Sequence, residues 1–139
     1  YNLRDKTQPK LVETVQVVPP GVEVTDVRFL AGGSSLLVGD SRGHVTQWFP
    51  VRDDTNNFRL TRIRDFSALE RPVLRIEPEW FRKGFVAIDA GGRLGVFHTT
   101  AERTLLTVDT GITDTTLLSI SPRAETLVVA GGDGSARRY

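Results

Sequence analysis

The sequence predicts an all-β fold made of three similar antiparallel units, each with four strands. Two observations support this prediction. Short runs of β-branched and aromatic residues recur at intervals of about ten residues with turn residues between them, the spacing of an antiparallel all-β protein. One sequence pattern also occurs three times along the chain, which is typical of folds assembled from a repeated supersecondary unit.

The short apolar runs predict the strands in order. Most of the runs are rich in residues that suit a pleated surface and are bounded by residues that favour turns. A period matching an α-helix is hard to find between them. The predicted strands are 11–18, 25–30, 35–39, 44–48, 58–63, 73–76, 85–88, 94–98, 104–108, 117–120, 126–130 and 135–139.

The repeated pattern joins an apolar strand to a polar turn, a glycine, a second strand and an aromatic residue. The first copy spans 36–48, the second begins 49 residues later (85 minus 36), and the third follows after 42 more (127 minus 85). The glycines are Gly43, Gly92 and Gly134, and the final aromatic residues are Trp48, Phe97 and Tyr139. A period of this length fits the four-stranded blade of a β-propeller.

The turn residues have a physical explanation. A tight hairpin needs a position with positive φ, which glycine adopts without steric cost. An aspartate placed before it can accept hydrogen bonds from the turn backbone, so Asp40, Asp89 and Asp133 are predicted to be turn formers. The aromatic residue that ends each copy offers a large area for packing between neighbouring blades.

The blades are predicted at about 21–65, 70–109 and 112–139, within a single domain spanning 1–139. Three blades are fewer than the four to eight that usually close a propeller, so the fan is expected to be partial or unclosed. The third blade stops at its third strand. The predicted strand 11–18 either completes that last blade or belongs to a blade that precedes the first.

Two segments resemble the WD-repeat blade. Residues 120–139 combine an apolar strand, Ser-Pro, Leu-Val-Val, Gly-Gly-Asp-Gly, a strand and an aromatic residue, and residues 25–49 place Trp48 at the tryptophan position. Phe49 stands where that family has aspartate, and the Gly-His dipeptide that opens each blade is missing. The hydrogen-bonded tetrad of the family is therefore not predicted.

A second resemblance is to the soluble domain inserted after the first transmembrane helix in the long form of bacterial phosphate ABC transporter permeases. The strings that carry it are 28–30, 35–41, 48–52, 82–85, 101–106 and 133–137. The resemblance implies a periplasmic domain held at the inner membrane by its parent chain, acting as a docking or regulatory platform in phosphate transport. Its partners would be the rest of the permease, a substrate-binding protein or a second copy. The alternative is a cytoplasmic WD-repeat-like scaffold fragment that binds a protein or peptide.

Composition excludes several classes of function. The chain has no cysteine, which rules out disulfides and thiolate sites, and its 18 basic and 17 acidic residues are interspersed, which gives no basic stripe for nucleic acid. No apolar run approaches the roughly 20 residues of a membrane helix. The chain starts at Tyr1 and contains no methionine, so we expect it to be cut from a longer protein. The permease resemblance implies that this longer protein is membrane-bound.

No chemistry-bearing constellation emerges, so no enzyme activity, cofactor or metal site is predicted. His44 and His98 lie on different blades with too few acidic neighbours for a tetrahedral metal site, and 131–134 lacks the lysine and helix of a phosphate loop. The oxygen-rich 53–57 fits a polar turn better than a calcium loop. The predicted contact residues are two aromatic and two cationic residues in one connection, Trp80, Phe81, Arg82 and Lys83.

Overall fold

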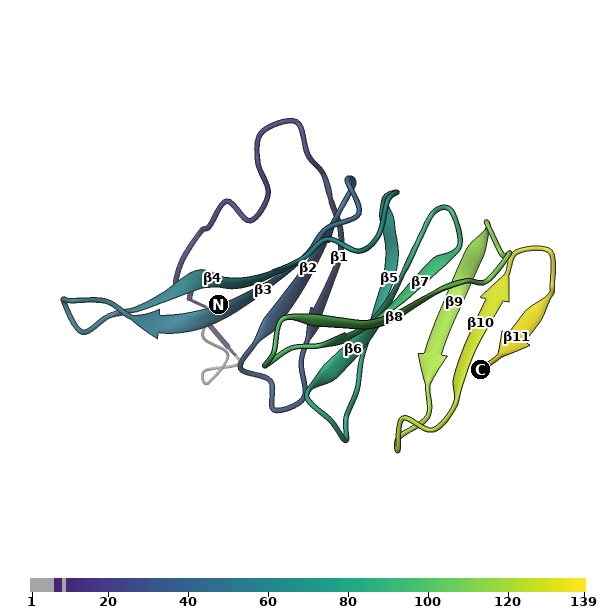
Figure 1. The fold of residues 1–139 in the computed structure, drawn as a ribbon. Coiled ribbons are helices and arrows are strands. Elements are labelled where there is room, and N and C mark those ends of the chain that lie inside the picture. Colours follow the sequence, from purple (N-terminus) through teal and green to yellow (C-terminus); the bar gives the residue numbers. More distant parts are fainter. Residues whose placement is uncertain (1–6, 9) are drawn as a thin grey trace.

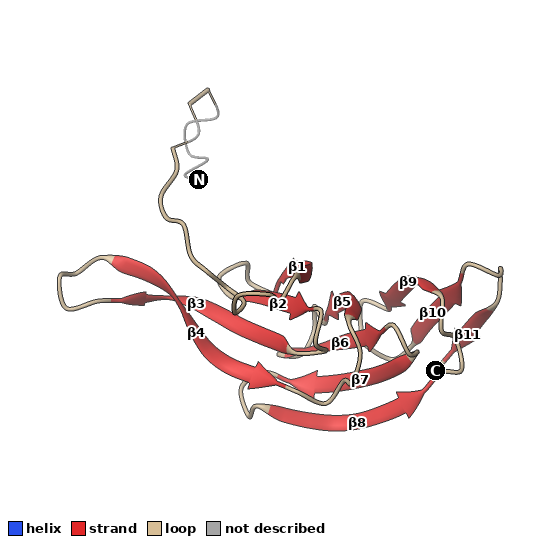
Figure 2. Cartoon of the chain, turned by 90° about the horizontal axis from the view of Figure 1, so that it is seen from above, coloured by secondary structure: helices blue, strands red, loops and turns tan. Residues whose placement is uncertain are grey.

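The computed structural model of the protein describes residues 7, 8 and 10–139. These residues form eleven strands and no helix, which confirms the predicted all-β class. Figure 2 shows only strands and the loops that join them. In this part of the chain there is accordingly no helix long and apolar enough to cross a membrane.

Strands that follow one another in the sequence pair within three antiparallel sheets, which we call the first, second and third blades. The first blade contains β1 (Val24–Phe29), β2 (Leu36–Asp40), β3 (Val45–Arg52) and β4 (Phe58–Phe66). The second blade contains β5 (Val73–Pro78), β6 (Gly84–Asp89), β7 (Arg93–His98) and β8 (Arg103–Asp109). The third blade contains β9 (Thr115–Ile120), β10 (Leu127–Gly131) and β11 (Ala136–Arg138).

The three blades stand side by side as an open fan (Figure 1). The first strands of successive blades are neighbours, since β1 contacts β5 and β5 contacts β9. The first and third blades lie at opposite ends of the fan and do not close it (Figure 1). The prediction of an unclosed set of propeller-type blades is therefore confirmed.

The predicted strand at 11–18 is wrong. These residues make no strand, and they lie against the first blade, where the Leu60 amide donates to Glu13 Oε2 at 3.0 Å. Val15, Val17 and Val18 pack on the face of that blade. The alternating β-branched residues correctly indicate an extended backbone, but its side chains pack on a sheet face instead of its amides pairing with a sheet edge. The segment consequently does not complete the third blade.

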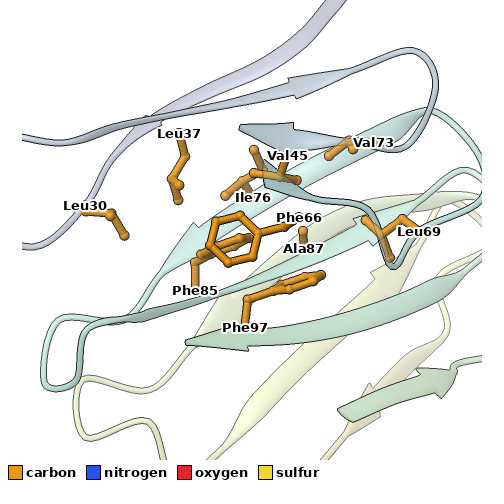
Figure 3. Close-up of a cluster of buried hydrophobic side chains, with 10 residues drawn as sticks. All are labelled: Leu30, Leu37, Val45, Phe66, Leu69, Val73, Ile76, Phe85, Ala87 and Phe97. Carbon is orange, nitrogen blue, oxygen red and sulfur yellow. The ribbon is translucent and has the colours of Figure 1, made fainter. Parts of the chain in front are cut away.

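The first and second blades enclose the larger core (Figure 3). Its centre is a cluster of three phenylalanines, in which Phe66 meets Phe85 edge-on at 5.1 Å between ring centroids and Phe85 stacks on Phe97 at 4.7 Å. Edge-on and stacked ring pairs add to the stabilisation that burial alone provides. The remaining members of the cluster are Leu30, Leu37, Val45, Leu69, Val73, Ile76 and Ala87.

The second and third blades enclose a smaller core, and the N-terminal segment builds a third cluster on the first blade. The smaller core consists of Val86, Ile88, Leu94, Ile112, Leu127 and Val129. In the third cluster, Val18 packs with Val38 and Trp48 on the face of the first blade that points away from the second. Trp48 thus packs against the N-terminal segment, whereas its counterpart Phe97 packs against a blade.

Candidate interaction surface

The turn aspartates lie in the hairpins between the second and third strands of their blades. Asp40 and Asp89 each accept hydrogen bonds from the amides two and four residues later, at 2.8 to 3.0 Å. Asp133 accepts from the amide and the hydroxyl of Ser135 at 2.9 and 2.7 Å. The hydroxyl bond is the main cause that lowers the pKa of Asp133 below its ordinary value. The Asp40 and Asp133 carboxylates are thus occupied by their own turns, whereas Asp89 also accepts hydrogen bonds from the amides of Glu70 and Arg71, at 3.1 and 3.2 Å, in the link between the first two blades.

The turn glycines share positive φ values, 89° at Gly43, 81° at Gly92 and 84° at Gly134. Their surroundings differ. A side chain at Gly43 or Gly92 would meet a backbone carbonyl of the link to the next blade, that of Arg71 or of Ile112. A side chain at Gly134 would meet nothing within 4 Å. The first two glycines are thus required by packing as well as by backbone conformation.

The connection between β5 and β6 carries the predicted contact residues. Trp80 is 73% exposed and Phe81 is 72% exposed, and Arg82 and Lys83 are exposed beside them. The base of this loop is fixed, because the amide and hydroxyl of Thr99 both donate to the Lys83 carbonyl, at 2.9 and 2.8 Å. Two large aromatic side chains therefore project into solvent from an anchored hairpin.

The same loop borders a groove of 340 Å³ between the first and second blades. Arg82 and Lys83 reach it from the second blade, and Arg64 reaches it from the first. Apolar side chains of the first blade, including the partly exposed Phe49 and Ile63, line the groove beside them. The remaining lining residues are Leu30, Ala31, Ser34, Ser35, Gln47, Thr99 and Thr100.

The groove is positively charged. None of its described lining residues is acidic, and none of its three cations has a carboxylate partner within 4.0 Å among the described residues. A polar chain orients Arg64, which donates to Gln47 Oε1 at 3.4 Å, while Gln47 Nε2 donates to Ser35 Oγ at 3.2 Å. The buried Gln47 thereby holds the Arg64 guanidinium against the groove wall.

A second groove lies at the opposite end of the second blade and differs in charge. It has a volume of 460 Å³ and mixes acidic with basic lining residues, among them Asp89 and Asp109 beside Arg71. Glu70 Oε1 and Arg93 Nη1 form an ion pair at 3.0 Å there. Its charges are largely balanced locally.

The residues that the first blade contributes to the positive groove were not predicted from the sequence. Phe49, Ile63 and Arg64 lie far from the loop 80–83 in the chain, and only the packing of two blades brings them together. Arg64 lies two residues before the buried Phe66 on β4, so the two side chains share the face toward the second blade. Gln47 is the partner of Arg64 on β3 and lies on the same face.

The polar clusters considered for metal binding have local partners. Asp53 Oδ1 accepts from the amides of Thr55 and Asn57 and from the Thr55 hydroxyl, at 2.8 to 3.0 Å. The hydroxyl bond is the first cause that lowers the pKa of Asp53. Across residues 7, 8 and 10–139 no group of three or more His, Asp or Glu side chains could hold an ion together.

Comparison with known proteins supports the fold. No family model matches the chain, and no curated protein matches it. A solved structure titled "Crystal Structure of Mitotic Checkpoint Complex" contains a WD40 propeller chain that superposes with a TM-score of 0.71 at 18% identity. The match covers 88% of this chain and 35% of that one, so this chain spans about a third of its structural neighbour. The likeness shows that the chain has the fold of WD-repeat-like β-propeller blades.

Proposed function

We propose that the protein is a protein-interaction scaffold and that the loop Trp80–Lys83, together with the adjoining positive groove, is its contact surface. The observation that carries this proposal is the exposure of two neighbouring large aromatic side chains on a hairpin whose base is fixed. Tryptophan, tyrosine and arginine dominate the energetics of protein interfaces, and an anchored loop loses little entropy on binding.

The bridging position of the surface adds support. The loop belongs to the second blade and the groove is completed by the first, so a partner would contact both. Binding and recognition residues are commonly carried by loops on a rigid scaffold. The WD-repeat-like fold is consistent with such a role, although fold alone does not establish function.

The setting in a phosphate ABC transporter permease stays a prediction that rests on sequence resemblance alone, and the comparisons favour the WD-repeat-like scaffold instead. The same holds for the periplasmic, membrane-attached location and for the permease, substrate-binding protein or second copy as partners. The parent gene discriminates between the two settings, because it would encode either hydrophobic permease helices or further blades beside this segment.

The scaffold proposal is tested by selecting, from a display library of random short peptides, those that bind the purified protein. The variant Trp80→Ser/Phe81→Ser removes the exposed aromatic side chains without touching a core. We expect it to weaken binding of the enriched peptides by about tenfold or more. The matched control is Phe29→Ser/Phe58→Ser, which removes two other exposed aromatic side chains and should leave affinity within about twofold.

Two results would overturn the proposal. One is a selection that enriches no peptide at all. The other is an equal loss of affinity in both double variants, which would show that the peptides bind exposed aromatic side chains without preference for this loop.

A further inference from the structure

We infer that the positive groove between the first and second blades binds an acidic peptide segment that also carries large apolar side chains. This inference rests on the proposed function, because it names the chemistry of the partner for the same surface. It follows from the charge of the groove, from its apolar lining and from the contrast with the groove at the other end of the second blade.

The charge argument begins with the three cations. Arg64, Arg82 and Lys83 line one groove, lack carboxylate partners among the described residues, and have no acidic residue beside them in the lining. Like charges gathered in a concave site repel one another until an anion enters. Arginine also recognises carboxylates through paired parallel hydrogen bonds. Carboxylate side chains are therefore the complementary ligand groups.

The lining defines the rest of the ligand. Phe49 and Ile63 are partly exposed in the groove, and burying them against apolar side chains of a ligand would be favourable. Ser34 and Thr100 line the same groove, and their hydroxyls can bond the polar backbone of an extended segment, that of Thr100 in addition to its contact with His98 Nδ1 at 3.1 Å. A ligand with acidic groups, apolar side chains and a polar backbone is a peptide.

A nucleic acid strand fits the same surface less well. Binding to a phosphate backbone draws on many cations arranged along a stripe, whereas this groove offers three within a chain of net charge +1. The apolar lining at Phe49 and Ile63 offers nothing to a phosphate. We therefore assign an acidic peptide and treat binding of nucleic acid as an outcome of the test.

The experiment uses the same peptide selection and reads the sequences of the enriched peptides. We expect them to combine Asp or Glu with Leu, Ile, Phe or Trp. One enriched peptide is then labelled, and its affinity is measured by fluorescence polarisation at low salt and at about 0.15 M salt. A copy with Asn and Gln in place of its acidic residues, and a single-stranded oligonucleotide of similar length, are measured beside it.

The charge-reversal variant is Arg82→Glu/Lys83→Glu, which changes two exposed side chains. We expect affinity for the acidic peptide to fall about tenfold at low salt and less at higher salt, because two attractions become repulsions. The matched control is Arg42→Glu/Arg71→Glu, which makes the same charge change with exposed residues at the opposite end of the blades. It should leave affinity within about twofold.

The outcomes separate the inference from the proposed function. Enriched peptides without acidic residues that still lose binding in Trp80→Ser/Phe81→Ser would overturn the acidic-peptide inference and leave the scaffold proposal standing. Equal loss in both charge-reversal variants, unchanged affinity of the neutral peptide copy, or tighter binding of the oligonucleotide would also overturn the inference. A selection that enriches nothing would overturn both.

Discussion

The two outward faces of the fan differ in how far they are covered. On the first blade, the segment before β1 covers the face that points away from the second blade, and Val18 and Trp48 are buried there. On the third blade, no described residue covers the corresponding far face, and Leu117 and Val128 are exposed. A blade of this kind is therefore completed by whatever packs on its face, and an extended segment can take the place of a neighbouring blade.

One repeated position shows the difference most clearly. Leu37, Val86 and Val128 each follow the first residue of the repeated pattern, and each points toward the next place in the fan. Leu37 is 0% exposed beneath the second blade, Val86 is 2% exposed beneath the third, and Val128 is 38% exposed with no described blade beyond it. The residue type is similar at all three, so the neighbour sets the burial.

Alanine substitution at this position should give the largest losses of stability predicted here. The loss should be larger where a neighbouring blade covers the residue than where none does. We expect Leu37→Ala to lower the free energy of unfolding by about 2 to 5 kcal/mol, because it opens a cavity in the larger core. Val86→Ala should cost about 2 kcal/mol in the smaller core. Val128→Ala should cost about 0.5 kcal/mol or less, as for other exposed positions.

Urea unfolding followed by circular dichroism measures the three values. A loss at Val128 as large as that at Val86 would contradict the comparison. It would mean that the far face of the third blade is covered in the folded protein.

The second prediction concerns the face of the first blade that the N-terminal segment covers. Val18→Ala removes part of the cover over Trp48, and we expect it to lower the free energy of unfolding by about 1 to 2 kcal/mol. Trp48 should also become more exposed, which shifts its fluorescence to longer wavelength. The spectrum is read in a Trp80→Phe background, so that Trp48 is the only tryptophan.

The control lies in the same segment. Val12 is 67% exposed whereas Val18 is 9% exposed, so Val12→Ala should change neither stability nor the Trp48 spectrum measurably. Equal effects of the two substitutions would show that the segment does not pack on the blade as described.

The sequence predicts the blades well because both of their determinants are local. Strand patterning and the requirement for positive φ at Gly43 and Gly92 act within a hairpin, and they locate the strands within a few residues. The role of 11–18 depends on which surface it meets, and an alternating apolar pattern fits a sheet face as well as a sheet edge. The positive groove depends on the packing of two blades, so the sequence could identify its loop but not Arg64.

Burial between blades also acts on one ionisable group, and this gives the smallest predicted effect. Burial raises the pKa of Glu77 on β5 above its ordinary value of 4.5, with the nearby positive charge of Arg28 opposing the shift and Asp26 adding to it. Glu77 on β5 pairs with Val86 on β6 in the second blade. In the third blade, Ser119 on β9 pairs with Val128 on β10 in the same way. Ser119 therefore occupies the matching place in the third blade, where it is exposed.

The sign of the effect follows from the raised pKa. The folded protein holds the Glu77 proton more tightly than the unfolded chain, so this residue favours folding below pH 4.5 relative to higher pH, and that advantage is lost as pH rises through the folded pKa. Relative to Glu77→Gln, the wild type should thus lose a small part of its stability across this window, because Glu77 is only half-buried. Ser119→Glu should add no such dependence, since its face is bare. Urea unfolding of the three proteins at several pH values measures both differences, and a pH dependence in Ser119→Glu equal to that of Glu77 would show that the third blade is as well covered as the second.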